Sequence, residues 1–287
     1  MRPMRVTETV DTAVALFRAN WRPFMAIVAI VTIPLTFVQQ LVTRGSFQAF
    51  PTSFDPSTTT ATPAPSAGVV VSTVILSMIG FLIVRPFLTA AMTRAISAAY
   101  LAQSVDVGAA YRFALRRFGS VLWVQILEIL ALIGVGIAFV LVATVLTAAH
   151  VVPVVVLLAI GVFILVAVLL VRWIIATPAV VVEDARGAKA LRRSWDLTRS
   201  SFWRLFGTLL LTYLLAGIVG FIVGTVPTIA SAFVPAGWLL RVIGGVLSAI
   251  VTTPFISAVT VLLYFDARIR REGLDIAMML RDIVTER

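Results

Sequence analysis

The chain of 287 residues contains no cysteine, one histidine and one lysine, and only 13% of its residues are charged. Without cysteine it can form no disulfide, no thiolate zinc site and no cysteine nucleophile. The single histidine, His150, has no second histidine or carboxylate near it in sequence for a metal site or for acid–base chemistry. The sequence therefore predicts no catalytic residue, no metal ion and no cofactor, and we expect a protein that is not an enzyme.

Apolar residues are abundant instead, at 60% of the chain, and the mean hydropathy is +1.06. Soluble domains are about half apolar and about a quarter charged. A membrane span needs roughly 20 apolar residues, and six runs of the sequence qualify. They lie at about 24–43, 69–93, 119–147, 154–177, 205–226 and 239–264. The predicted fold class is an all-α polytopic membrane protein with six transmembrane helices in a single integral membrane domain, 1–287.

The net charge of +10 is unevenly placed. Of the 23 Lys and Arg residues, 19 fall in segments that alternate with pairs of apolar runs, while 45–80 and 147–157 hold none. This asymmetry is typical of cytoplasmic segments and predicts a multi-pass inner (plasma) membrane protein with both termini in the cytoplasm. No RNA- or DNA-binding motif accompanies the basic residues, so we expect no nucleic-acid partner. The basic segments are 1–23, 94–117, 183–204 and 268–287.

Pairing the spans reveals an internal repeat. Three hairpins at about 5–102, 105–184 and 185–272 each begin with a cytoplasmic amphipathic interfacial helix. Their returning spans carry Pro86, Pro178 and Pro254. Each proline is expected to break or kink its span, because it frees a backbone carbonyl, which a neighbouring group can satisfy. The Ser-, Thr- and Pro-rich segment 45–67 is predicted to be an extracytoplasmic loop, and 266–287 a cytoplasmic tail.

The amphipathic pattern is strongest just before the third hairpin. On a helical wheel, Ala188, Leu191, Trp195, Thr198 and Phe202 share one stripe, opposite a basic face. Such a helix is expected to lie on a membrane surface and to bind anionic lipid headgroups. The candidate lipid-headgroup surface consists of Arg186, Lys189, Arg192, Arg193, Arg199 and Arg204.

Three charged residues lie at least five residues inside predicted spans, where a charge is costly without a partner. We expect Glu128 to pair with Arg85 or Arg172, with Gln125 sharing the network. A structural ion pair, a substrate or proton site, and snorkelling of the arginines are the three interpretations. Separately, the small-residue spacing Gly220-x-x-x-Gly224 favours close helix packing within the chain over dimerisation.

Two stretches, Ala176–Gly207 and Thr253–Asp275, resemble the glycerophosphoryl diester phosphodiesterase membrane domain family. The shared features are an acidic step at Glu183, a basic helix with Ser194-Trp195, and Phe202-Trp203-Arg204. The resemblance implies a multi-helix bacterial membrane domain. In some members this domain anchors a separate phosphodiesterase barrel of roughly 250 residues. The predicted spans leave no room for such a barrel here, so the resemblance does not imply phosphodiesterase activity.

These observations predict a non-enzymatic membrane scaffold or accessory subunit that engages anionic lipid headgroups at the cytoplasmic face, or a partner protein. The alternative is a small-molecule or lipid transporter that uses the charge cluster of Arg85, Glu128 and Arg172. An intramembrane enzyme acting on lipid is the third class, and no catalytic constellation supports it.

Overall fold

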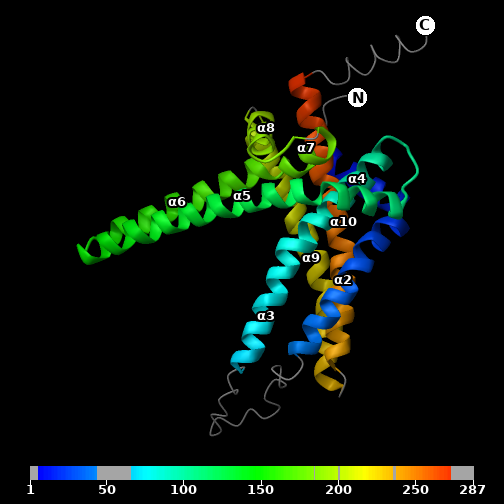
Figure 1. Cartoon of the computed structure of the whole chain (residues 1–287), viewed down its shortest axis with the longest axis horizontal. Coiled ribbons are helices and arrows are strands. Elements are labelled where there is room, and N and C mark those ends of the chain that lie inside the picture. The colour runs from blue at the N-terminus through cyan, green and yellow to red at the C-terminus, as the bar shows by residue number, and fades with distance from the viewer. Residues whose placement is uncertain (1–5, 44–65, 184, 200, 235–236, 273–287) are drawn as a thin grey trace.

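The fold is described by a computed structural model for residues 6–43, 66–183, 185–199, 201–234 and 237–272. Helices alone make up the regular structure of these residues (Figure 1). In chain order they are α1 (Val6–Ala19), α2 (Trp21–Thr43), α3 (Ala67–Ile79), the π-helical turn η1 (Gly80–Val84), α4 (Arg85–Tyr100), α5 (Val107–Ala148), α6 (Val152–Trp173), α7 (Ala176–Glu183), α8 (Ala188–Thr198), α9 (Phe202–Ala230), the 3-10 turn η2 (Ser231–Phe233) and α10 (Gly237–Glu272).

Six helical segments are long and apolar enough to cross a membrane, which confirms the predicted number of candidate spans. They are Trp21–Thr43, Ala67–Tyr100, Val107–Ala148, Val152–Glu183, Phe202–Phe233 and Gly237–Glu272. The second continues as helix to Tyr100. The predicted loop 45–67 lies almost wholly outside the described residues, as does the tail beyond Glu272.

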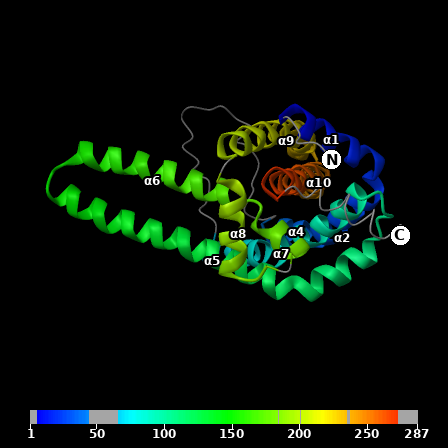
Figure 2. The same ribbon diagram turned by 90° about the horizontal axis from the view of Figure 1, so that it is seen from above.

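Helix α10 is the centre of a body formed with α2, α3 and α9. Half of its most apolar 18-residue window is buried, against at most 17% in the other five candidate spans. It packs along α9 and α2 and also contacts α1 and α4. Helices α2, α3, α9 and α10 extend in the same direction from one end of the molecule. At that end α1, α4, α7 and α8 lie together (Figures 1 and 2). We call this end the base.

Small residues bring α9 and α10 together. A Cβ added to Gly244 would lie 2.9 Å from the Gly224 carbonyl oxygen, and one added to Gly220 would lie 2.9 Å from Ser248 Oγ. Both distances are shorter than real Cβ contacts, so larger residues would push the helices apart. The prediction that Gly220-x-x-x-Gly224 packs within the chain is confirmed.

Helices α5 and α6 form an antiparallel pair, here called the arm, which points away from the body and runs across its direction (Figure 1). Glu128 lies 20 residues before the end of α5 at Ala148, and Arg172 lies 20 residues after the start of α6 at Val152. No charged residue lies between Glu128 and Arg172 in the sequence. At about 1.5 Å per residue, each uncharged half is about 30 Å long, which matches the hydrocarbon thickness of a bilayer.

The three prolines act differently. Before Pro86 the helix widens into η1, where the Arg85 N–H donates to the Gly80 carbonyl five residues back. Before Pro178 the chain turns at 174–175 between α6 and α7. Pro254 lies inside the uninterrupted α10, so the expectation of a break in all three returning spans is wrong for the third.

The amphipathic segments also differ from one another. The first is a separate helix, α1, which packs on α10 and α9. The second, around Tyr111, is the beginning of the continuous helix α5. The third is α8, which packs against α5, α6, α7 and α10. The two spans of each predicted hairpin touch each other. However, α2 contacts α10 more extensively than it contacts α3, its own hairpin partner, so the three hairpins are not packed in the same way.

Candidate functional site

At the base, the acidic end of α7 meets the basic helix α8 and the end of α10. Glu183 accepts two hydrogen bonds from Arg193, from Nε at 2.7 Å and from Nη2 at 3.0 Å. It also accepts a hydrogen bond of 2.6 Å from the hydroxyl of Tyr264, a fully buried side chain. These bonds bring together the two stretches on which the family resemblance depends, although Glu183 and Tyr264 are 81 residues apart.

The end of α10 surrounds this contact because its charged residues recur at helical spacing. Tyr264, Arg268 and Glu272 follow at intervals of four and therefore share one face of the helix. Arg268 Nε lies 3.2 Å from Glu183 Oε1 and 3.1 Å from Glu272 Oε2. Glu272 also forms an ion pair with Arg193. The hydrogen bonds that Arg193 donates to Glu183 raise the pKa of the Arg193 guanidinium above its usual value, so this group stays charged.

A second pair of residues on α10, Asp266 and Arg270, points to α9. Asp266 is fully buried and forms ion pairs with Arg204 and with Arg270, whose Nε lies 3.1 Å away. The ring of the adjacent Phe265 stacks on Tyr100 of α4, with centroids 5.2 Å apart. Asp266 therefore fixes the start of α9 to the end of α10. We call the following residues the base cluster: Glu183, Arg193, Arg204, Tyr264, Asp266, Arg268, Arg270 and Glu272.

This arrangement is suited to holding helices together. Removing one partner of a buried ion pair lowers the stability of the fold, because the other charge is left without compensation. The three carboxylates of the base cluster are engaged by arginines, with one tyrosine hydroxyl added. Among the described residues, no group of three or more His, Cys, Asp or Glu side chains could hold a metal ion.

The start of α8 is set by Gly187, which has φ +55°. A Cβ at this position would lie 3.1 Å from the Trp123 ring of α5. The helix then buries Ala190, Ser194, Leu197 and Thr198. Of the predicted apolar stripe, Ala188 and Trp195 are exposed and remain available to a membrane surface, whereas Thr198 is buried within the protein. Burial of Ser194 against α6 is possible because its hydroxyl donates to the Arg172 carbonyl at 2.6 Å.

The predicted lipid-headgroup surface divides into two groups. Arg193 and Arg204 are turned inward to carboxylates, with side-chain exposures of 29% and 20%. Arg186, Lys189, Arg192 and Arg199 are exposed. Lipid contact by this exposed group stays a prediction, whereas the two inward residues have a structural role that the helical wheel missed.

The intramembrane charges do not form the predicted cluster. Within the described chain, none of the ion pairs includes Glu128, and the cation whose charge acts on it is Arg85. Arg85 itself lies over the Phe81 ring, 5.2 Å from its centroid. Arg172 is stacked on Trp195 instead. Of the two partners predicted for Glu128, Arg85 acts on it through its charge and Arg172 does not, so the candidate charge cluster of Arg85, Glu128 and Arg172 is not one ion-paired group in the described chain.

Gln125 has a role that explains the break at Pro86. In η1 the Arg85 N–H bonds to Gly80, and Pro86 has no N–H to offer, so the Phe81 carbonyl lacks a backbone donor. Gln125 Nε2 of α5 donates to this carbonyl at 2.5 Å. The expectation that a neighbour satisfies a carbonyl freed by proline is confirmed here, and Gln125 thereby joins the arm to the second span.

A family model described as Domain of unknown function (DUF7847) matches residues 4–267. The chain belongs to this family. No curated protein and no solved structure matches it. The DUF7847 match covers the base cluster up to Asp266, but the description carries no activity. The resemblance to the glycerophosphoryl diester phosphodiesterase membrane domain family stays a prediction.

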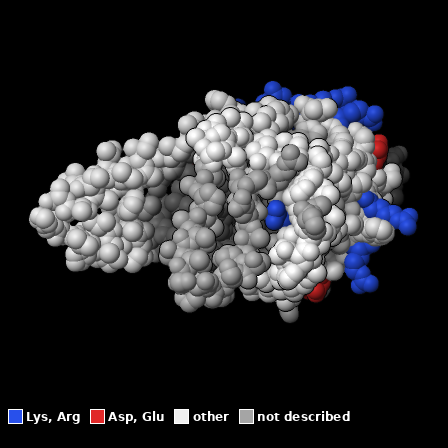
Figure 3. Space-filling model, turned by 90° about the horizontal axis from the view of Figure 1, so that it is seen from below, with Lys and Arg blue, Asp and Glu red and all other residues white. Residues whose placement is uncertain are grey.

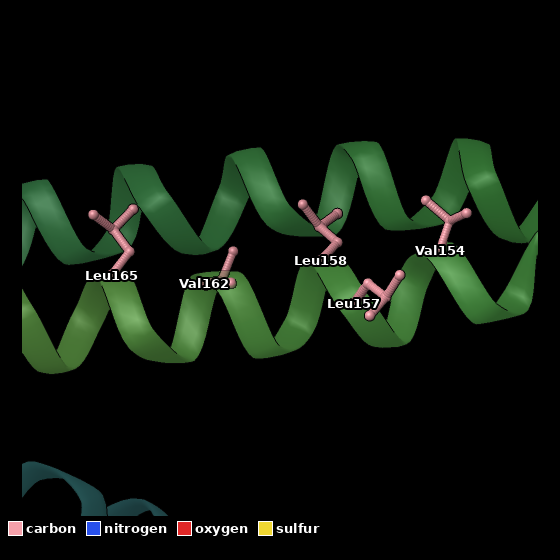
Figure 4. A pocket seen from close by; sticks show the side chains of 6 residues that line it. Val154, Leu157, Leu158, Val162 and Leu165 are labelled. Carbon is pink, nitrogen blue, oxygen red and sulfur yellow. The ribbon is translucent and has the colours of Figure 1, made fainter.

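In this DUF7847 chain two shallow, open pockets among the described residues lie on the surface of the arm. One is lined by α6 side chains, with the neighbouring helix of the arm beside it (Figure 4). The other is on α5. All lining residues are apolar: Val154, Leu157, Leu158, Gly161, Val162 and Leu165 in the first, and Ile133, Gly136, Ile137, Phe139, Val140 and Leu141 in the second.

Proposed function

We propose that this chain is a non-enzymatic integral membrane scaffold or accessory subunit that engages anionic lipid headgroups, or a partner protein, through its base. The observation that carries the proposal is that the base has two kinds of charged residue: those paired inside the protein and those exposed on α8. The carboxylates of the base cluster are paired and hold α7, α8, α9 and α10 together. Lys189, Arg192 and Arg199 are exposed on the helix that this clamp holds.

The charge pattern supports an inner-membrane orientation with both termini in the cytoplasm. In the view from below, the arm carries no blue or red atoms, whereas Lys and Arg gather at the other side of the molecule (Figure 3). Tryptophans, which concentrate at membrane interfaces, mark the base of both the arm and the body. They are Trp21, Trp123, Trp173, Trp195 and Trp203.

The arm and the body each have a bilayer-length apolar part that starts at this tryptophan level. One flat bilayer can hold both only when the arm lies alongside α2, α3, α9 and α10 and not across them. We therefore propose that the arm bends within its uncharged part, beyond Glu128 and Arg172, when it inserts into a membrane, so that Arg172 keeps its contacts with Trp195 and Phe202.

Lipid selectivity in reconstituted membranes tests the proposal. Spin-labelled phosphatidylglycerol and phosphatidylcholine are compared for association with the protein in vesicles. The wild type is expected to prefer phosphatidylglycerol, because each basic residue near an anionic surface contributes about 1 kcal/mol. The triple variant K189Q/R192Q/R199Q should lose most of this preference, and high salt should weaken it.

Asp196→Asn is the matched control, since Asp196 is an exposed acid on the same helix. It raises the positive charge of α8 and should strengthen the preference for phosphatidylglycerol. Equal preference in the wild type and the triple variant would show that the exposed residues of α8 do not engage lipid. The proposal would then depend on a partner protein.

The transporter alternative rests on the π-helical turn η1 in the second span, close to Gln125 and Glu128 of α5. Broken helices near the membrane midplane are typical of transporter binding sites. The pockets described above are apolar, and Arg172 is directed elsewhere. These observations favour the scaffold.

A further inference from the structure

Arg172, at the end of α6, lies close to two aromatic rings of other helices. Its guanidinium carbon is 4.4 Å from the centroid of Trp195 on α8 and 5.6 Å from that of Phe202 on α9. Aromatic faces attract a planar cation and fix its orientation. The Ser194 hydroxyl also bonds to the Arg172 carbonyl, so the backbone and the side chain of this residue are both held.

The guanidinium has no anionic partner in the described chain. Its Nε and Nη1 atoms are buried and have no hydrogen-bond acceptor. Glu128 lies at the same level of the arm, but the charge that acts on it is that of Arg85. An arginine is always charged and carries five N–H donors. A charged guanidinium without an anionic partner in an apolar setting is costly, so an anion from outside the protein is expected.

The depth of Arg172 identifies the kind of acceptor. The uncharged part of the arm begins next to it and is about one hydrocarbon thickness long. Trp173, the next residue, is of the type that concentrates at the headgroup level. The anionic group that phosphatidylglycerol and phosphatidylcholine share at this depth is the phosphodiester. Arg172 as a whole is only partly buried, so a group outside the protein can reach it.

We propose that Arg172, Trp195 and Phe202 form a binding site for the phosphodiester of one membrane phospholipid. The two rings hold the guanidinium in place, and the part of the guanidinium that is not buried donates to a phosphate oxygen. The bound phospholipid joins α6, α8 and α9 at the root of the arm. The inference rests on the proposed membrane location, but it differs from the exposed basic face because the phosphate, and not the headgroup charge, is recognised.

Native mass spectrometry of the full chain tests this site. The detergent-solubilised protein is incubated with dioleoylphosphatidylglycerol, with dioleoylphosphatidylcholine, or with inorganic phosphate, and the number of retained ligands is counted. The wild type is expected to retain one tightly held phospholipid of either class and no inorganic phosphate. Arg172→Gln should lower the occupancy of that lipid about tenfold, and Trp195→Leu should lower it less. Arg116→Gln, an exposed arginine at the base, is the control and should retain the lipid.

Arg172→Lys keeps the charge but lacks the planar group that stacks on the rings. It is expected to fold and to hold the lipid with reduced occupancy, so it carries the test should Arg172→Gln fail to fold. Unchanged lipid retention in Arg172→Lys and Arg172→Gln overturns the site, as does equal retention of inorganic phosphate. The triple variant K189Q/R192Q/R199Q should keep the lipid, so the failure of this site and the failure of the proposed function are distinguishable.

Discussion

Replacing Asp266 with asparagine is expected to lower the free energy of unfolding by about 3 kcal/mol, at the lower end of the range for breaking a buried ion pair. Asp266 is fully buried and compensates both Arg204 and Arg270. The variant leaves both guanidiniums next to a neutral amide. The lower end of the range applies because the side chains of Arg204 and Arg270 are 20% and 34% exposed and can be partly hydrated.

Thermal unfolding of the purified protein in one detergent, followed by circular dichroism, measures this effect. Asp196→Asn is the matched control, because it makes the same chemical change at an exposed position of α8. The control should shift the midpoint little. Equal midpoints for the two variants would show that Asp266 does not hold α9 to α10.

Glu183→Gln is the second variant with a large expected effect, a loss of about 2 kcal/mol. Glu183 accepts from Arg193 and Tyr264 and lies 3.2 Å from Arg268, so neutralising it weakens three contacts between α7, α8 and α10. Charge-assisted hydrogen bonds of this kind are stronger than neutral ones.

A double-mutant cycle isolates the part that belongs to the Glu183–Arg193 pair. Glu183→Gln, Arg193→Gln and the double variant are unfolded under the same conditions, and a coupling energy of at least about 1 kcal/mol is expected. Arg199→Gln in place of Arg193→Gln is the control, since Arg199 is exposed on the same helix. Strict additivity for Glu183 and Arg193 would contradict the clamp.

The all-helical fold could be predicted from the sequence because it depends on local composition. Apolar runs near the length of a bilayer indicate candidate spans wherever they occur, and all six were found. The direction of the arm could not be predicted, since its all-round apolar surface gives no preferred face for packing on the body. The behaviour of the prolines also depends on neighbours, as Gln125 at the Phe81 carbonyl shows.

The base cluster was recognised only in part. The importance of the stretch around Glu183 and of the ending around Asp266 could be inferred, but not their contact, because 81 residues separate Glu183 from Tyr264. The alternation Tyr264-x-Asp266-x-Arg268-x-Arg270-x-Glu272 was the available signal. It places two sets of polar groups on two faces of one helix, which requires two partners.

The helical wheel of α8 did not indicate the partners of Arg193 and Trp195, for a related reason. A wheel ranks faces by apolarity and so assigned Trp195 to the membrane side and Arg193 to the headgroups. In the structure Arg193 has carboxylate partners on α7 and α10, and Trp195 has a cation partner, Arg172. Specific partners from distant parts of the chain override the apolar ranking.

The central claim is that all six helices cross one bilayer, with the basic base on its cytoplasmic side. Since the chain has no cysteine, single cysteines can be placed at His150 in the turn of the arm, at Phe233 at the far end of α9, and at Arg192 on the base. Intact cells are labelled with a membrane-impermeant maleimide. We predict labelling of the cysteines at 150 and 233 from outside, and of that at 192 only after permeabilisation. Labelling at 233 without labelling at 150, with 150 reached only after permeabilisation, would show that the arm does not span the membrane beside the body and would contradict the account.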